Sequence, residues 1–440
     1  MASAVYSSLR FVKMSVLKGD FVYRAPPIVV NSARGSRIYS DTREYVDLQA
    51  SSGASILGYD NSILSSIDLT GTMLSKPQTC ESETRLRVAD ILRTKFQAAL
   101  GKEGRIGFEL GGAQGIELAL KVAIAARPKF HLVTIEGAYH GRSLFTSHLS
   151  SSRRYVLGMD PQFRHQRLPN PVLMAEGGTV DKVASLEQCI QHVKQIFRDE
   201  RFGFMDPHGS VPIFVFETVQ NVAGMLDIPA SYLQAIEECV REAGGVTIAD
   251  EIFTGMYRLG GFCAHVSKGL KPDIVVMSKG LTNGLVPLSI IWVGDDSGLS
   301  ETFRPGTHSC TYINNELALL TLEAVLRRLA SIPEIENLAV GARLHSSIAQ
   351  HVPEVAALDA FATGNVLRLN FPTSETAKRF SELITEHAEI GVLHATTGLA
   401  KSSVIFHPAY VIGEEDIAAS ALVCAEAMKK LERFRSLQAA

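Results

Sequence analysis

The sequence lacks long apolar runs and an excess of charge of either sign. Its longest apolar stretches are strand-sized and interrupted by charges or glycines, so none is long enough to cross a bilayer. Lys and Arg total 43 against 46 Asp and Glu, a net charge of −3. The basic residues are scattered along the chain, which argues against nucleic acid as a partner. There is also no internal repeat and no low-complexity tract.

The 6 cysteines lie far apart, with no Cys-x-x-Cys pair and no histidine at metal-ligand spacing. This pattern argues against a zinc site and favours a reducing compartment, so a cytoplasmic protein is expected. The first 19 residues carry Arg10, Lys13 and Lys18, with no acid before Asp20. A mitochondrial presequence is therefore an alternative to a short helix that leads into the first lobe.

Between about residues 100 and 300, short β-rich runs alternate with helix-like stretches, as in a parallel sheet flanked by helices. Each run is nearly continuous in apolar residues, which is typical of a strand covered on both faces. Each also ends in a polar or glycine-bearing segment, and ligands of open α/β sheets bind at the carboxyl ends of the strands. The runs are 131–137, 211–217, 246–251, 273–279 and 288–294.

Beyond about residue 320 the pattern changes. A long helix is expected at 317–329, a strand at 366–370 and a terminal helix from Glu414, and helical periodicity also marks 83–100. Because 440 residues exceed one compact unit, these segments predict a second, smaller α+β lobe.

The strongest local signal is Lys279, which ends the apolar run Val276-Met-Ser and precedes a glycine-bearing turn. Charged side chains seldom lie at the buried end of a central strand unless they are paired or chemically used. A desolvated lysine loses basicity and becomes a nucleophile towards carbonyls. The alternative is a lysine that merely extends out of the sheet to solvent.

Two carboxylates, Asp250 and Glu251, end another apolar strand. Alternation along a strand sends their side chains to opposite faces, so one of them can point into a site while the other pairs elsewhere. A carboxylate buried beside a pyridine nitrogen would keep that nitrogen protonated. Paired acids also serve as metal ligands or as a general acid and base, although no further ligands stand at suitable spacing.

Three further segments carry polar or glycine-rich chemistry. The turn Leu110-Gly-Gly-Ala-Gln-Gly115 runs into a helix, and such a turn offers backbone N–H groups to a phosphate. It fits neither a Walker loop nor a dinucleotide fingerprint. In Gly137-Ala-Tyr139-His-Gly141 an aromatic ring is placed to lie flat on a planar ligand. The segments 217–220 and 308–315 add hydroxyl and amide groups in loops.

In order and spacing these motifs resemble the fold-type I, class III aminotransferases, from about residue 20 to residue 430. The order is the specific part: a glycine turn, Gly-Ala-Tyr-His-Gly, Glu-x-x-Gln, Asp-Glu, Ser-Lys-Gly and a late Thr. Further segments also look like this family, namely 35–41, 257–261, 271–273 and 281–284.

The resemblance implies pyridoxal 5′-phosphate as the cofactor and a role for each motif residue. Lys279 would bind the cofactor as a Schiff base and later move the proton between the substrate carbon and the cofactor. Asp250 would pair with the pyridinium nitrogen. Tyr139 and Ile252 would pack on the two faces of the ring, and Gln220 would hydrogen-bond the phenolic oxygen.

The phosphate and the subunit contacts follow from the same resemblance. Gly112 and Ala113 would offer backbone N–H groups to the phosphate, and Glu217 would lie beside the cofactor. Thr311 would reach the phosphate of the neighbouring subunit, which makes a homodimer part of the prediction.

The implied fold is a large cofactor-binding domain with a mostly parallel seven-stranded sheet, at 66–320. A smaller α+β domain is expected from both termini, at 1–65 and 321–440.

The sequence departs from the family pattern in three places. The phosphate turn has Gly111, Ala113 and Gln114 where a hydroxyl and an acid are usual, and 218–221 reads Thr-Val-Gln-Asn in place of Pro-x-Gln-Gly. Many relatives also carry an arginine before a late Pro-Pro-Leu segment, where it binds a substrate α-carboxylate. The corresponding stretch 403–410 has none.

These residues predict an aminotransferase that moves an amino group between an amine or ω-amino acid and a keto acid or aldehyde. Without the arginine, Glu217 is expected to face the site and to favour an amine-bearing or non-carboxylate substrate. A racemase, aminomutase or decarboxylase on the same cofactor is the alternative, because such enzymes share all the cofactor residues.

Overall fold

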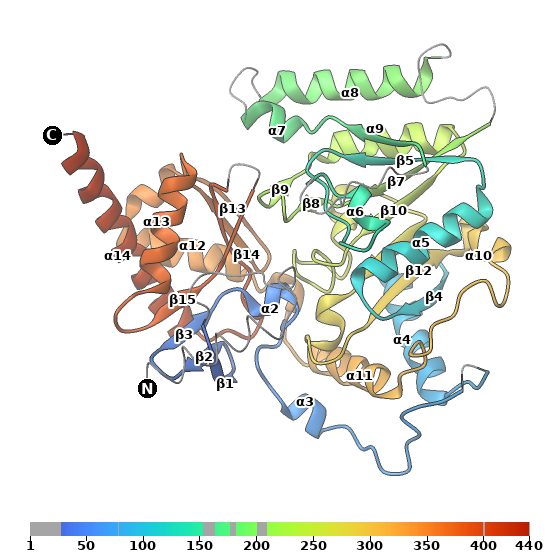
Figure 1. The fold of residues 1–440 in the computed structure, drawn as a ribbon, viewed down its shortest axis with the longest axis horizontal. Coiled ribbons are helices and arrows are strands. Elements are labelled where there is room, and N and C mark those ends of the chain that lie inside the picture. The colour runs from blue at the N-terminus through green and yellow to red at the C-terminus, as the bar shows by residue number, and fades with distance from the viewer. Residues whose placement is uncertain are drawn as a thin grey trace, which may run out of the picture.

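A computed structural model describes residues 28–77, 79–152, 163–176, 182–199, 209–398 and 401–439. The first 19 residues, where a presequence is one of the expectations, lie outside this range. Figure 1 shows a larger body built around a central sheet and a smaller body that holds both labelled ends of the chain. Within the described residues, no helix combines the length and apolarity that a bilayer crossing requires.

Seven strands of the described chain form the central sheet, in the order β4-β12-β11-β10-β7-β5-β6. β12 pairs antiparallel with β11 and with β4, while the pairs among β11, β10, β7, β5 and β6 are parallel. The sheet is thus mostly parallel, as expected. The strands are β4 (Gly104–Glu109), β5 (Phe130–Ile135), β6 (His165–Leu168), β7 (Val211–Phe216), β10 (Val246–Asp250), β11 (Ile274–Met277) and β12 (Ser289–Gly294).

Helices cover both faces of this sheet, which explains the continuous apolar runs. On β11, Ile274 and Val276 pack in one core with helix α5 (Gly112–Ala126). Val275 and Met277 pack in the other core, with α4 (Glu83–Leu100), α9 (Ala230–Glu242) and α11 (Glu316–Ala330). Beyond α9 lies α8 (Lys182–Arg198), preceded by α7 (Pro171–Glu176).

The helix ends follow ordinary capping rules. The Ser82 hydroxyl accepts from the Arg85 N–H at the start of α4, and the Asn315 side chain accepts from the Ala318 N–H at the start of α11. Gly101 ends α4 in the left-handed conformation.

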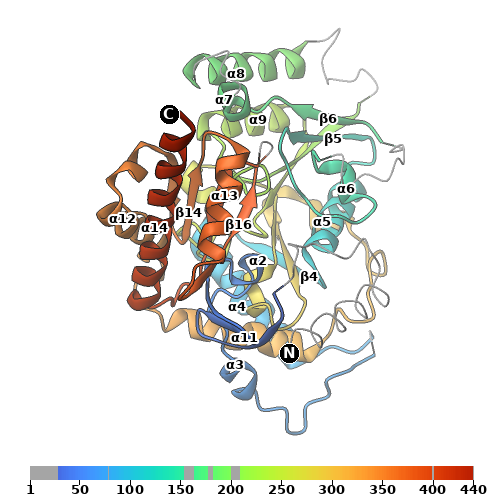
Figure 2. The same ribbon diagram turned by 60° about the vertical axis from the view of Figure 1, so that its left-hand side comes forward.

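The smaller body combines the two ends of the chain. β1 (Val30–Arg34), β2 (Arg37–Ser40) and β3 (Glu44–Asp47) form a sheet that β15 (Gly391–Leu393) completes by pairing in parallel with β3. A second sheet has the order β13-β14-β17-β16, and the helices α12, α13 and α14 pack against the two sheets within this body (Figure 2). These elements are β13 (Asp359–Thr363), β14 (Val366–Asn370), β16 (Ala395–Thr397), β17 (Ser403–Phe406), α12 (Val340–His351), α13 (Ser374–Thr385) and α14 (Glu414–Ala439).

The domain boundaries at 65/66 and 320/321 remain a proposal. The apolar side chains of α11, including Leu322, Val325 and Leu329, pack in the large core with α4. This packing would place the second boundary closer to the end of α11 than to residue 320.

Candidate active site

Lys279 lies just beyond the carboxyl end of β11, where the chain enters the 3₁₀ helix η4 (Lys279–Thr282). Its backbone is left-handed, with φ 47°, which is uncommon for a residue with a side chain and costs conformational energy. The Nζ atom lies 4.9 Å from the centre of the Phe253 ring. The turn is held in place because the Ser278 hydroxyl donates to the Leu288 carbonyl at 2.8 Å and Gly280 packs against Ile56.

The amine of Lys279 is less basic than that of an exposed lysine. Burial lowers its pKa to about 8, although the carboxylates of Asp250 and Glu217 oppose the shift, and the Arg258 guanidinium adds to it. A fraction of the amine is therefore neutral, and so nucleophilic, near neutral pH.

Asp250 ends β10 and is almost completely buried. Its Oδ2 atom lies 2.8 Å from Nδ1 of His140, and its Oδ1 atom accepts from the Ile252 N–H at 3.1 Å. Burial opposes a charge on the imidazole, but Asp250 and Glu217 outweigh it and raise the pKa of His140. Asp250 is thus held in a fixed orientation by the His140 ring and the Ile252 N–H.

Glu251 points to different partners, as the strand alternation predicts. Its carboxylate lies 2.8 Å from Nδ1 of His265 and accepts from the backbone N–H groups of Ala264 and His265. The Thr254 hydroxyl donates to it as well. Burial disfavours the charge, yet these bonds lower the pKa of Glu251. This carboxylate therefore stabilises the segment that follows β10.

The predicted phosphate turn forms the start of α5. Gly111 precedes the helix in extended conformation, and no side chain caps the helix. A Cβ atom on Gly112 would lie 2.9 Å from Cδ1 of Ile252, and one on Gly141 would lie 2.7 Å from Cβ of Ala113. The glycines thus let three predicted segments approach each other closely at a helix N-terminus, which suits an anion.

The Tyr139 segment is joined to the end of β7. Oε1 of Glu217 accepts from the backbone N–H of Tyr139 at 2.8 Å. Burial raises the pKa of Glu217 to about 7, with Asp250 adding to the shift and His140 and Lys279 opposing it. Among the salt bridges of the described residues, none pairs Glu217 with a guanidinium.

Gln220 belongs to the short strand β8 (Val219–Gln220), and its side chain is buried. Its Oε1 atom accepts from Nδ2 of Asn170 at 2.9 Å, and the same nitrogen donates to the Glu136 carbonyl. A Cβ atom on Gly137 would lie 2.5 Å from this oxygen, so the glycine allows Gln220 to reach the turn.

Thr311 is exposed, in a turn before α11. The hydrogen bonds of the described residues do not connect it with Lys279 or with the phosphate turn of its own chain. The nearby His308 lies 3.2 Å from Oε1 of Glu109 and from Nζ of Lys121. The other predicted residues gather at the carboxyl ends of neighbouring strands.

Several residues at this site were not predicted from the sequence. His140 and Asn170 orient Asp250 and Gln220, and Phe253 lies beside the Lys279 amine. His140 belongs to the motif Gly137-Ala-Tyr139-His-Gly141, so its position next to Tyr139 was a usable signal. Asn170 and Phe253 come from irregular segments and gave none.

The stretch 403–410, where many relatives have an arginine, forms the buried strand β17 and the turn after it. Ile405 is fully buried in an apolar cluster with Val219, Met225, Phe253 and Val366. One wall near Lys279 is therefore apolar, since Phe253 belongs both to this cluster and to the surroundings of the amine.

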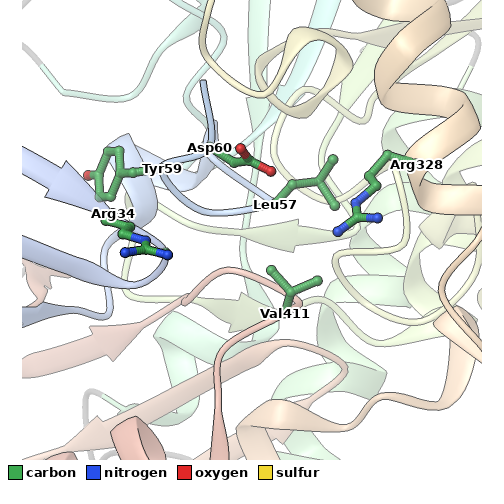
Figure 3. A pocket seen from close by; sticks show the side chains of 7 residues that line it. Arg34, Leu57, Tyr59, Asp60, Arg328 and Val411 are labelled. Atoms are coloured by element: carbon green, nitrogen blue, oxygen red, sulfur yellow. The ribbon is translucent and has the colours of Figure 1, made fainter. Parts of the chain in front are cut away.

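A separate cavity of about 300 Å³ lies elsewhere, as Figure 3 shows. None of the predicted site residues lines it. Its lining residues are Arg34, Gly35, Leu57, Tyr59, Asp60, Arg328 and Val411.

The residues around Lys279 fit pyridoxal phosphate. They supply a nucleophilic amine, an oriented carboxylate, an aliphatic side chain against a glycine turn, and an uncapped helix N-terminus for the phosphate. Together with the sheet order, this arrangement defines a fold-type I pyridoxal-phosphate enzyme.

The family model of the class-III aminotransferases matches residues 21–428, and the chain belongs to this family. It is a pyridoxal-phosphate-dependent aminotransferase. A diaminobutyrate–2-oxoglutarate aminotransferase of Rhizobium meliloti is 28% identical over 73% of this chain and 68% of its own length. An acetylornithine aminotransferase of Mycolicibacterium smegmatis is also 28% identical, over 70% of this chain and 71% of its own.

Solved structures show the same fold. A Bacillus anthracis aminotransferase superposes with a TM-score of 0.83 over 98% of this chain and 99% of its own, at 20% identity. An ω-transaminase of Pseudomonas jessenii, solved with PMP, gives 0.83 over 97% and 98%, at 17% identity.

Proposed function

We propose that this aminotransferase takes its amino group from amines or ω-amino acids and passes it to a keto acid or an aldehyde. The observation that carries the proposal is the apolar cluster around Ile405 in the stretch where many relatives place an arginine. A planar guanidinium binds a carboxylate through two charge-assisted bonds, and an aliphatic cluster cannot replace them.

We further propose how the site residues hold the cofactor. Lys279 would bind it, Asp250 would pair with its ring nitrogen, and Tyr139 and Ile252 would pack on its two faces. Gln220 would bind its phenolic oxygen. The bound cofactor supplies an electrophilic carbonyl and an electron-accepting ring.

The phosphate would lie at the backbone N–H groups of Gly112 and Ala113. Nζ of Lys279 would then take the proton from the substrate carbon, with Phe253 limiting access of water on one side.

Glu217 would favour donors with a second amine. Its carboxyl is buried, has a pKa of about 7, and forms no ion pair with a guanidinium among the described residues. Above that pKa it carries a negative charge that attracts an ammonium group, although its Oε1 atom also holds the Tyr139 N–H.

A donor screen tests the proposal. Diamines, ω-amino acids and α-amino acids are each mixed with the holoenzyme, and conversion of the cofactor to its amine form is followed by absorbance. We expect kcat/KM for the ω-amines to exceed that for α-amino acids by about tenfold or more, the equivalent of roughly 1.5 kcal/mol for charge-assisted bonds. A preference for α-amino acids would contradict the proposal. An unchanged donor ranking in Glu217→Gln would exclude the role of Glu217.

A homodimer is also proposed. Several large apolar side chains are exposed on the chain, among them Met73 (63%), Tyr312 (62%) and Leu86 (60%). Exposed apolar surface of this kind is typical of subunit interfaces. The cytoplasm is the proposed compartment, with the mitochondrion as the alternative, since all 6 cysteines are free thiols.

A further inference from the structure

The turn Met256-Tyr257-Arg258 of the larger body is bound by the smaller body at each of its residues. The Tyr410 hydroxyl donates to the Met256 carbonyl at 2.7 Å. Asn365 donates from its side chain to the Tyr257 carbonyl at 3.3 Å and from its backbone N–H to the Arg258 carbonyl at 2.9 Å. We call Met256, Tyr257 and Arg258, together with the residues Tyr410 and Asn365 that bind them, the clasp.

The Arg258 side chain extends the same contact. Its Nη1 atom donates to the carbonyls of His407 at 3.2 Å and Pro408 at 2.9 Å, and Nη2 donates to that of Gly53 at 2.9 Å. Gly53 belongs to the N-terminal part of the chain, and the other two residues belong to the C-terminal part. One planar guanidinium therefore joins the larger body to both ends of the chain.

This arrangement is energetically expensive. Arg258 has no exposed surface, and among the described residues no carboxylate forms a salt bridge with it. Buried charges are ordinarily paired. Met256 and Tyr257 also have positive φ values of 55° and 68°, which side chains disfavour. Such costs persist where the surrounding contacts hold one conformation, and they concentrate at functional sites.

The clasp leads directly to Lys279 through one aromatic ring. The Arg258 guanidinium lies 5.7 Å from the centre of the Phe253 ring, and Nζ of Lys279 lies 4.9 Å from it. The His407 ring packs edge-on against Phe253 at 5.4 Å. The Cζ atom of Arg258 lies 4.9 Å from the centre of the Tyr410 ring. Fixing Arg258 thus fixes the wall beside the reactive amine.

We infer that Arg258 is a positioning residue that locks the smaller body onto the larger one and so shapes the donor pocket beside Lys279. The inference rests on the proposed role of Lys279. Because Arg258 touches backbone carbonyls and rings only, its loss should weaken donor binding more than it slows the proton transfer. In such a variant, part of the binding energy of the donor is used to order the pocket, and KM for the donor rises.

Three variants separate the parts of the clasp. Arg258→Lys keeps the charge, but one ammonium group cannot span three carbonyls in the fixed geometry of a guanidinium. Arg258→Met removes both the charge and the bonds. Tyr410→Phe removes only the bond to Met256 and keeps the ring on Arg258. Arg327→Met, an exposed arginine of α11, is the matched control.

Two readouts are needed, and the first does not depend on activity. The amides of His407 and Tyr410 donate to the carbonyls of Leu48 and Ile56, both at 2.7 Å, and their hydrogen exchange reports how firmly the segment bound by the Arg258 guanidinium is held. We expect faster exchange in all three clasp variants and wild-type exchange in Arg327→Met. Wild-type exchange in Arg258→Lys would overturn the inference.

The second readout is donor kinetics. In Arg258→Lys we expect KM for the donor to rise about tenfold or more while kcat changes less than threefold. Tyr410→Phe should shift KM in the same direction by a smaller factor, and it carries the test if Arg258→Met does not fold. A fall in kcat at unchanged KM would refute the positioning role. Absence of a borohydride-fixed cofactor adduct on Lys279 in the wild type would instead refute the proposed function.

Discussion

At the scale of single residues, the orientation of the Lys279 amine follows from its position in the fold. The strand end brings the amine to the edge of the sheet, and the left-handed backbone turns the side chain towards Phe253. The sequence indicated this lysine because a charge at the end of an apolar run is unusual. It did not indicate Phe253, and it marked Arg258 only as part of the family-like segment 257–261, without a role. Both residues come from an irregular turn whose conformation depends on contacts with distant parts of the chain.

The lowered basicity of Lys279 predicts how cofactor uptake depends on pH. Only the neutral amine attacks the cofactor aldehyde, and burial lowers the pKa of Lys279 to about 8. The neutral fraction therefore rises as the pH increases through 8 and falls about tenfold per unit well below it. We expect the rate of cofactor uptake by the apoprotein, followed by absorbance, to follow this curve. A rate that still rises tenfold per unit above pH 9 would show an amine of ordinary basicity.

At the scale of elements, β10 places adjacent carboxylates in different surroundings. Asp250 binds His140 beside the Lys279 amine, whereas Glu251 binds His265 and two backbone N–H groups. Strand alternation predicted this division, but it could not say which face held the site. The resemblance to the family assigned the role to Asp250, and the partner histidines became evident only in the fold.

These different surroundings predict that Asp250→Asn mainly lowers activity, whereas Glu251→Gln mainly lowers stability. Asp250→Asn should lower kcat/KM about a hundredfold or more, because an oriented charge is lost at the site, with a small change in stability. Glu251→Gln should destabilise the fold by about 1–3 kcal/mol and leave kcat of the folded enzyme nearly unchanged. Thermal unfolding and kinetics of the two purified proteins check both statements.

The pH dependence of stability gives a further check on Glu251. The folded protein lowers the pKa of this carboxyl, so its contribution is present above the unfolded pKa and is lost as the pH falls through the folded one. The stability gap between the wild type and Glu251→Gln should therefore shrink in acid. A gap that widens on acidification would contradict the assignment.

Some strands of the central sheet could be predicted from the sequence, and others could not. The five apolar runs all form strands of the central sheet, because burial on both faces leaves a continuous apolar signal. β4 and β6 were not predicted. β4 contains two glycines and an arginine, and β6 reads His-Gln-Arg-Leu at the edge of the sheet. Edge strands with one exposed face carry a weaker pattern.

At the scale of the whole molecule, the smaller body depends on pairing between distant parts of the chain. β3 pairs in parallel with β15, which brings Val46 opposite Val392. No local pattern encodes such a pairing, so only the family resemblance predicted a domain formed from both termini. The contacts of Arg258 with Gly53, His407 and Pro408 likewise cannot be predicted from local motifs, although the segment 257–261 resembles the family.

The contact of Thr311 with the phosphate of the neighbouring subunit is the prediction at the largest scale, and mixed dimers test it. Two differently tagged chains, Lys279→Ala and Thr311→Ala, are produced together, and the mixed dimer is purified by both tags. If Thr311 acts on the neighbouring phosphate, the one site with an intact lysine receives its threonine from the Lys279→Ala chain. That site should bind the cofactor as tightly as a wild-type site and give half the wild-type activity per dimer.

The Thr311→Ala homodimer is the control, because both of its sites lose the threonine. Loss of a hydrogen bond to a charged phosphate costs roughly 1.5 kcal/mol or more, so its cofactor affinity should fall about tenfold. If the mixed dimer shows the same weak affinity, Thr311 serves the phosphate of its own chain. The predicted contact across the interface requires Thr311 to be accessible to the neighbouring subunit, and its side chain is exposed.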